Sequence, residues 1–229
     1  MLYMEINQEN LKNEILSYGA DLVGFCRLGF DGMPPQNLSH AISIAVKLPD
    51  AVLNTIENRP TISYFHSYRT ANAYLDNISF KICRLIESKY GYNAFPVPAS
   101  QSTADDKSSY KSVFSHKTAA RLSGLGFIGK SALFISKEYG SKVRLATVLT
   151  DMPLYSDCPP IADGCGDCNL CVKACPAGAI SGISYVQGMK RDEFFSAEKC
   201  SNNMKNYKDI GRGAVCGICI KVCPYNKLK

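Results

Sequence analysis

The sequence lacks several features that would place the protein in other classes. No stretch approaches the ~20 consecutive apolar residues that a membrane-spanning helix needs, so no membrane association is expected. The first residues, MLYMEINQEN, have neither the basic start nor the apolar core of a secretory signal. The chain also shows no low-complexity segment, and its 26 lysines and arginines are scattered rather than clustered. These absences predict a cytoplasmic protein whose cysteines stay reduced.

Cysteine, in contrast, is abundant and unevenly placed. The chain has 11 cysteines, and eight of them fall after residue 164. The first run reads Cys165-x2-Cys168-x2-Cys171-x3-Cys175-Pro176, and a partial copy follows as Cys216-x2-Cys219-x3-Cys223-Pro224. The first run is the bacterial ferredoxin signature for 4Fe–4S clusters, so the C-terminal third is predicted to transfer electrons.

Two other interpretations of these cysteines fit less well. Structural zinc favours paired C-x2-C knuckles separated by a long gap, whereas this run adds a third cysteine and a Cys-Pro. A disulfide framework would suit a secreted chain better than one with no visible secretory segment.

The spacing also predicts how the cysteines divide between two clusters. In two-cluster proteins the cysteine before proline binds the cluster of the other run. The second run lacks its first cysteine, and Cys200 is the nearby candidate to replace it. The predicted ligand sets are Cys165, Cys168, Cys171 and Cys223 for cluster 1, and Cys175, Cys200, Cys216 and Cys219 for cluster 2. The formal charge of +6 then falls to about +2, since each oxidised cluster with its thiolates carries about −2.

Apolar periodicity predicts an α+β chain with two parts. A medium domain is expected at 1–157, and a small double-cluster domain at 158–229. Helices are predicted at 8–18 and from about Tyr68 to Tyr90, the latter with an aromatic cluster at its start that suits a core. Extended segments are predicted at 21–26, 41–48, 95–99 and 144–150, and residues 151–160 read as a linker. Cys26 and Cys83 suit buried apolar positions. Cys158 lies near the first cysteine run, which has four cysteines without it.

One glycine-rich motif invites a different function. Residues 124–131, GLGFIGKS, match the P-loop pattern and also G-x-G-x-x-G. A P-loop needs a buried strand before its glycines, whereas the preceding HKTAARLS reads as helix. Two alternatives to a nucleotide site remain: a bend between two helical pieces, and a close approach of the backbone to another large cofactor.

Three segments resemble the epoxyqueuosine reductase family: residues 115–136, SHKTAARLSGLGFIGKSALFIS; residues 144–154, RLATVLTDMPL; and the two cysteine runs. Those enzymes reduce an epoxide in a modified tRNA base, use cobalamin and two 4Fe–4S clusters, and are related to reductive dehalogenases. The resemblance implies a nitroreductase-like α/β cobalamin-binding domain followed by a ferredoxin-like domain. It places cobalamin against the glycine motif, with Gly124, Gly126, Gly129, Lys130 and His116 as candidate binding residues.

The chain departs from the family at the proton donor. Family members carry an aspartate after an extended segment, where this chain has Pro96-Val97-Pro98-Ala99-Ser100. Asp105, Asp106 and Tyr110 follow in a polar loop and are the candidate replacements, Tyr110 because tyrosine is the donor in the related dehalogenases. The chain is also shorter than the family, which puts tRNA as the substrate in doubt.

Individual site residues have plainer interpretations beside these. His116 either caps and packs its helix or contacts the corrinoid. Lys130 either holds a polar group of the corrinoid or is solvated.

Three functions therefore compete. The leading one is a cobalamin-dependent reductase fed by an external low-potential electron donor. The second is an electron-transfer protein that reduces a corrinoid-protein partner without a substrate of its own. The third is a cluster domain on a domain that binds flavin or nothing.

Overall fold

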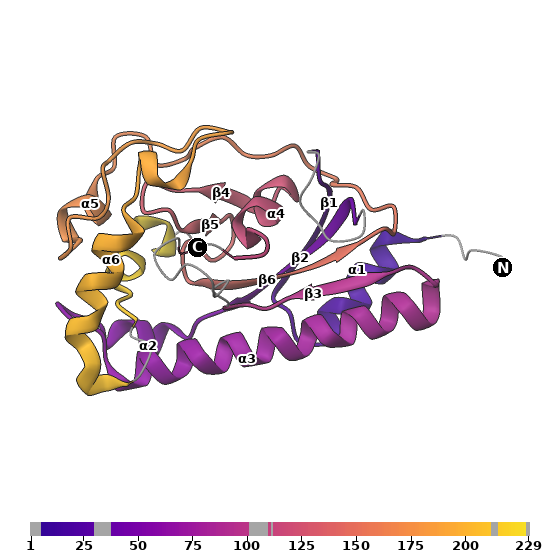
Figure 1. The fold of residues 1–229 in the computed structure, drawn as a ribbon, viewed down its shortest axis with the longest axis horizontal. Helices are drawn as coiled ribbons and strands as arrows, with labels where there is room; N and C mark the ends of the chain where they lie inside the picture. Colours follow the sequence, from indigo (N-terminus) through magenta and orange to yellow (C-terminus); the bar gives the residue numbers. More distant parts are fainter. Residues whose placement is uncertain (1–5, 30–37, 101–109, 111, 212–214, 228–229) are drawn as a thin grey trace.

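A four-stranded antiparallel sheet lies at the centre of the protein (Figure 1). The computed structural model describes residues 6–29, 38–100, 110, 112–211 and 215–227. The strand order is β1-β2-β6-β3. The bounds are β1 Leu22–Arg27, β2 His40–Lys47, β3 Ala94–Val97 and β6 Val143–Thr150. All four predicted extended segments are confirmed to within two residues.

Helices cover both faces of this sheet. Strand β2 alternates side chains between the faces, so Ile42 and Ile44 face α1 (Gln8–Ser17) and α3 (Ile62–Leu85) in one core cluster. Ala41 faces the opposite way and packs with Ala119 of α4 (His116–Leu122). Because both faces of the sheet are covered, β2 is buried along almost its whole length rather than at alternate residues.

The long helix begins earlier than its apolar pattern predicts. Thr61 caps α3 by accepting a hydrogen bond from the backbone N–H of Tyr64, so the helix begins at Ile62 rather than near Tyr68. It passes into a π-helical turn at Ile86–Tyr90 and ends at Gly91, whose φ of +74° is left-handed. Among the residues that the structure describes, no helix has the length and apolar content to cross a membrane.

The glycine motif forms a hairpin, which corrects the prediction of a bend between two helical pieces. Helix α4 ends at Leu122, and β4 (Gly126–Ile128) pairs with β5 (Phe134–Ser136) in a separate two-stranded sheet. The carbonyl of Ile135 lies so close to Gly126 that a Cβ there would overlap it, so only glycine allows the two strands to pair this tightly.

The C-terminal region depends little on a hydrophobic core of its own. Residues 151–169 hold no helix or strand, as the predicted linker requires. Three short helices follow, namely α5 (Leu170–Ala174), α6 (Ala197–Met204) and α7 (Ile218–Lys221), and neither α5 nor α6 has a buried residue. Helix α7 differs, because Ile218 and Ile220 pack against Tyr64 and other core residues near the start of α3. The aromatic cluster at that point is therefore core, as predicted.

Candidate iron–sulfur centres and the adjoining cavity

The first cysteine run wraps around short turns. The N–H of Cys168 donates to the carbonyl of Cys165 at 3.0 Å, and Gly166 between them has a left-handed φ of +47°. Helix α5 then carries Cys171 and ends at Cys175. This succession of tight turns points three thiols toward one small volume, which a longer helix could not do.

The second run begins at a position that only glycine fits. Gly217 has a φ of +77°, and a Cβ there would lie 2.6 Å from the ring of Tyr64. The resulting turn starts α7, which carries Cys219 and leads to Cys223. Cys200 comes from elsewhere, on α6 behind its Ser196 cap.

Neighbouring cysteines of the two runs influence one another's pKa. Burial first, and then the charges of Cys223 and Cys168, raise the pKa of Cys171. Burial first, and then Cys216 and Cys175, raise the pKa of Cys200 to about 11. Burial, and then Cys216, Cys200, Cys175 and Cys171, raise the pKa of the half-buried Cys219, so Cys219 lies near cysteines of both runs.

These thiols suit an iron–sulfur cluster chemically. Burial first, and then the neighbouring thiols, raise the pKa of Cys171, Cys200 and Cys219, and bound iron would offset that cost as the protons leave. No group of three or more His, Cys, Asp or Glu side chains converges on a single ion within the described part of the chain. The thiolates of a 4Fe–4S cluster bind separate irons, so they need not converge on one point.

Lys130 contacts the first cysteine run. Its side chain is only 5% exposed, and its ammonium donates to the carbonyls of Gly166 and Cys168 at 2.7 and 3.3 Å and to Asn169 Oδ1 at 3.2 Å. Its backbone N–H bonds the Cys165 thiol and holds the pKa of that thiol lower than burial alone would. The interpretation of Lys130 as a solvated lysine is therefore wrong, because three acceptors of the cluster loop bind its ammonium.

Two glycines of the motif let the backbone of the β4–β5 region approach cysteines closely. A Cβ on Gly129 would lie 3.2 Å from Cys165 Sγ, so the backbone approaches the cluster thiol closely there. Gly124, with a φ of +69°, lies against Cys158 instead. Of the candidate corrinoid-binding residues, Gly124, Gly126, Gly129 and Lys130 are not among the lining residues of the large cavity described next.

A cavity of about 830 Å³ lies between the central sheet and the cysteine runs. Its size is near the upper end of the range for small-molecule pockets. Its walls come from α4, β5, β6 and the segment Lys190–Asp192. Ile220, between Cys219 and Cys223 in sequence, also lines it, and so does Ser141. The cavity therefore adjoins the second cysteine run.

His116 lies in this cavity with both ring nitrogens occupied. Nδ1 is 2.9 Å from Thr147 Oγ1 and Nε2 is 3.0 Å from the Pro98 carbonyl. A carbonyl only accepts, so Nε2 carries the proton and Nδ1 accepts from the threonine. Burial lowers the pKa of His116 to about 4, which keeps the ring neutral. His116 is therefore positioned to shape the wall, and neither nitrogen is free to bind a metal.

Basic residues that sequence reasoning missed also line the cavity. Lys117 donates to the Ala132 carbonyl at 2.7 Å, and Arg144 bonds Asn72 Oδ1 at 2.9 Å and lies 4.1 Å from the ring centroid of Tyr68. Burial, with Arg191 and Arg144 nearby, lowers the pKa of Lys117 to about 8. No sequence pattern signals this grouping, because its members come from α4, β6 and the cluster domain.

One proton-donor candidate reaches the cavity. Tyr110 lines it in a left-handed conformation with φ of +47°, and its carbonyl accepts from Arg191 Nη1 at 2.9 Å. Ala99 lines the cavity where the family motif predicts a nearby carboxylate. Asp105 and Asp106 lie outside the described residues.

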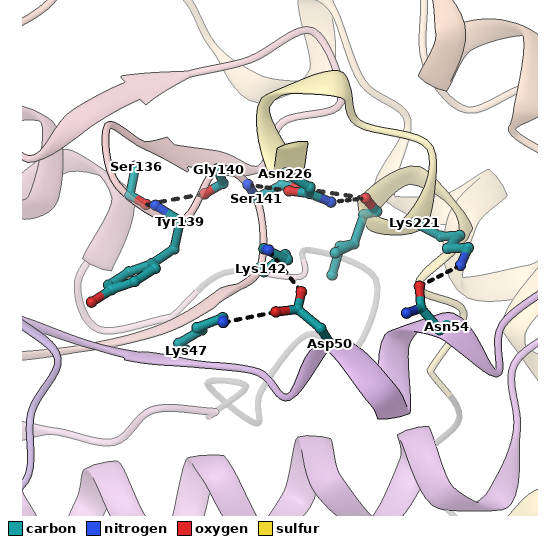
Figure 2. A network of polar contacts seen from close by, with 11 residues as sticks. Lys47, Asp50, Asn54, Ser136, Tyr139, Gly140, Ser141, Lys142, Lys221 and Asn226 are labelled. Atoms are coloured by element: carbon teal, nitrogen blue, oxygen red, sulfur yellow. Dashed lines mark hydrogen bonds and ion pairs between the residues drawn. The ribbon is translucent and has the colours of Figure 1, made fainter. Parts of the chain in front are cut away.

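A polar network fixes the second cysteine run to the sheet domain (Figure 2). Asn226 Oδ1 accepts from the backbone N–H of Ser141 at 2.9 Å, and Ser141 Oγ donates to the Ile220 carbonyl at 3.3 Å. Burial raises the pKa of the Cys223 thiol, and the nearby Ser141 and the backbone of Tyr225 offset part of that rise. Lys221 reaches Asn54 of α2 (Asp50–Asn54) at 2.8 Å. The segment that carries Cys219 and Cys223 is thereby fixed to the sheet domain.

Known proteins resemble this chain in sequence, most clearly in the region of the cysteine runs. Residues 164–226 match the family model of a 4Fe-4S double cluster binding domain. The epoxyqueuosine reductase of Listeria monocytogenes is 38% identical over 110 residues, which cover 47% of this chain and 28% of that protein. The matched regions span only 28% to 37% of the curated relatives' own length.

Two solved structures share the fold over nearly the whole chain. An epoxyqueuosine reductase with a tRNA stem loop superposes with a TM-score of 0.62 at 22% identity, covering 97% of this chain and 66% of the other. A reductive dehalogenase, whose structure suggests a mechanism for B12-dependent dehalogenation, gives 0.70 at 24% identity, covering 95% and 32%. The resemblance to epoxyqueuosine reductases that the motifs predict is thus confirmed, and residues 164–226 match a double 4Fe–4S cluster-binding domain.

Proposed function

We propose that the chain is an iron–sulfur reductase that uses cobalamin and receives electrons through two 4Fe–4S clusters. One observation carries this proposal. The segment that holds Cys219 and Cys223 also forms a wall of the large cavity through Ile220, and Ser141, which lines the same cavity, bonds the Ile220 carbonyl. Electrons on the clusters therefore have an adjoining acceptor site. The sequence resemblance and the shared fold with a B12-dependent dehalogenase support a corrinoid as its occupant.

The proposed roles follow from position. Cys165, Cys168, Cys171 and Cys223 hold one cluster, and Cys175, Cys200, Cys216 and Cys219 hold the other. Cobalamin, when bound, supplies a strongly reducing centre that the protein alone lacks. Apolar residues such as Phe134 and Leu145 exclude water from the cavity wall, and neutral His116 fixes Pro98 to β6 through its two hydrogen bonds. Tyr110 is the proposed proton donor within the described chain, because its position lines the cavity.

Binding and cluster content test the proposal together. Protein purified without oxygen and reconstituted with iron and sulfide should contain two 4Fe–4S clusters, by iron and sulfide analysis and by electron paramagnetic resonance (EPR) after reduction. Cobalamin added to that protein should bind with a change in its visible spectrum. Stoichiometric zinc with negligible iron would overturn the cluster assignment, and absence of cobalamin binding would overturn the cavity assignment.

The position of Ala99 favours a second candidate function. The cavity wall carries an alanine near where the family has its donor aspartate, and an electron-transfer protein that reduces a corrinoid-protein partner needs no proton donor. Turnover separates the two functions. Reduction of epoxyqueuosine-containing tRNA or of a small electrophile by the loaded protein supports the enzyme, whereas re-reduction of a separate corrinoid protein with no such turnover supports the alternative.

A further inference from the structure

The cavity has an uneven charge. Lys117, Arg144, Lys190 and Arg191 line it, and Asp192 is the acidic residue among its described lining residues. Asp192 accepts from Arg191 Nε at 3.0 Å, and its side chain is 76% exposed, so this pair lies toward solvent. The inner basic groups, Lys117 and Arg144, bond neutral acceptors, the Ala132 carbonyl and the Asn72 amide.

Neither Lys117 nor Arg144 forms an ion pair with a described residue, and holding these two charges close together is costly. Lys117 and Arg144 project from adjacent elements, α4 and β6, into a volume with limited solvent, where like charges repel more strongly than in water. The pKa of Lys117 reflects this cost, since burial and the charges of Arg191 and Arg144 all lower it. Guanidinium and ammonium groups gathered in this way are the usual ligands of carboxylate and phosphate groups.

We propose that this wall of the cavity binds an anionic group, a carboxylate or phosphate, carried by the small-molecule electron acceptor of the reductase. The inference rests on the proposed function and names its substrate class. Tyr110 lies beside the same basic groups, since Arg191 bonds its backbone carbonyl. An acceptor anchored there would place its reducible part against the apolar lining of Phe114, Phe134 and Leu145 and near the proposed proton donor.

Binding of such an anion is linked to protonation of Lys117. Among the described residues that line the cavity with Lys117, the charged and titratable ones are Arg144 on β6, Lys190, Arg191 and Asp192 on the opposite segment, and Tyr110 and His116 beside it. The arginines keep their charge at all relevant pH values, and burial keeps His116 neutral near pH 7. Since the pKa of Lys117 is about 8, an anion that needs its ammonium should bind about tenfold more weakly for each pH unit above that value.

Calorimetric titration of the reconstituted holoprotein tests the inference with simple probes. Benzoate and inorganic phosphate serve as anions, and benzamide is the uncharged analogue of benzoate. We expect an anion to bind, benzamide to bind at least about tenfold more weakly, and affinity to fall above pH 8. Lys117→Met should weaken binding about tenfold or more and remove the pH dependence, whereas Lys117→Arg should keep binding but lose the pH dependence. Lys81→Met, at an exposed position on α3, is the matched control and should change neither.

The outcomes separate this inference from the proposed function. Cobalamin binding with no anion binding would overturn the inference and leave the reductase standing. Anion binding without cobalamin binding would overturn the reductase and leave an anion site. Competition of the anion by cobalamin, but not by cobinamide, which lacks the nucleotide-loop phosphate, would assign the site to the cofactor and overturn the substrate class proposed.

Discussion

Replacing Lys130 with methionine tests the role that the hairpin lysine plays at cluster 1. The substitution keeps most of the side-chain volume and removes one buried positive charge. It leaves three uncharged acceptors, the carbonyls of Gly166 and Cys168 and the amide oxygen of Asn169, without their donor. The backbone N–H of residue 130 can still bond the Cys165 thiol in the variant. Any change therefore reports the loss of the ammonium group alone.

Two magnitudes follow from this geometry. Unit charges 4 Å apart interact by about 4 kcal/mol at an effective dielectric of about 20, and loop backbone separates this ammonium from the cluster, so about 1 to 2 kcal/mol is expected. For a one-electron couple at about 59 mV per tenfold change, this lowers the reduction potential by roughly 40 to 90 mV. The potential falls because a nearby positive charge favours the reduced, more negative cluster. Loss of the charged hydrogen bonds should also lower the free energy of unfolding by about 2 to 4 kcal/mol.

EPR-monitored redox titration measures the first effect, and thermal unfolding of the holoprotein measures the second. Lys173→Met is the matched control, because Lys173 lies on α5 in the same loop with its side chain exposed. An unchanged potential in Lys130→Met, with full iron content, would refute the assignment of Lys130 to the cluster. A shift of equal size in Lys173→Met would attribute the effect to net charge rather than to position.

Three further predictions use other contacts. Cys200→Ser should lose about half of the iron, because Cys200 lies near Cys216 and Cys175 and is a proposed ligand of the second cluster. The control Cys158→Ser should keep all of its iron. Full iron in Cys200→Ser would show that another ligand completes that cluster. Ser141→Ala removes the hydroxyl that bonds the Ile220 carbonyl and Asn226, and should lower the free energy of unfolding of the holoprotein by about 1 kcal/mol in urea titration. Ser88→Ala, in the exposed π-helical turn, is its control, and equal stability of Ser141→Ala and wild type would contradict the prediction. In His116→Gln, the free energy of unfolding should fall less steeply than in the wild type as the pH drops below about 6.5. The depressed pKa of His116, about 4, means that wild-type stability falls as pH drops from about 6.5 toward 4, by up to about 3 kcal/mol, and equal acid slopes of the two proteins in urea unfolding would refute this.

Local sequence signals predict the elements of this fold well. Alternation and apolar runs locate the four strands of the sheet, and Gly91 marks the end of the long helix. The start of that helix is misplaced because aromatic residues fill its first turns and the Thr61 cap, rather than apolar periodicity, decides where it begins. Neither alternative drawn from the sequence for the glycine motif, a bend or a close approach to a cofactor, includes the hairpin, because pairing of β4 with β5 depends on contacts across it.

The sequence by itself determined the electron-carrying half of this protein. Cysteine spacing within a short loop fixes which thiols turn toward a common volume, since only a few residues separate them. Tertiary structure decided the rest. It brings Cys200 to the second run, directs Lys130 at the cluster loop rather than at the cavity, and gathers Lys117, Arg144 and Arg191 around one space. Those contacts join residues far apart in the chain, and their charges and hydrogen bonds acquire meaning only when packing removes the water between them.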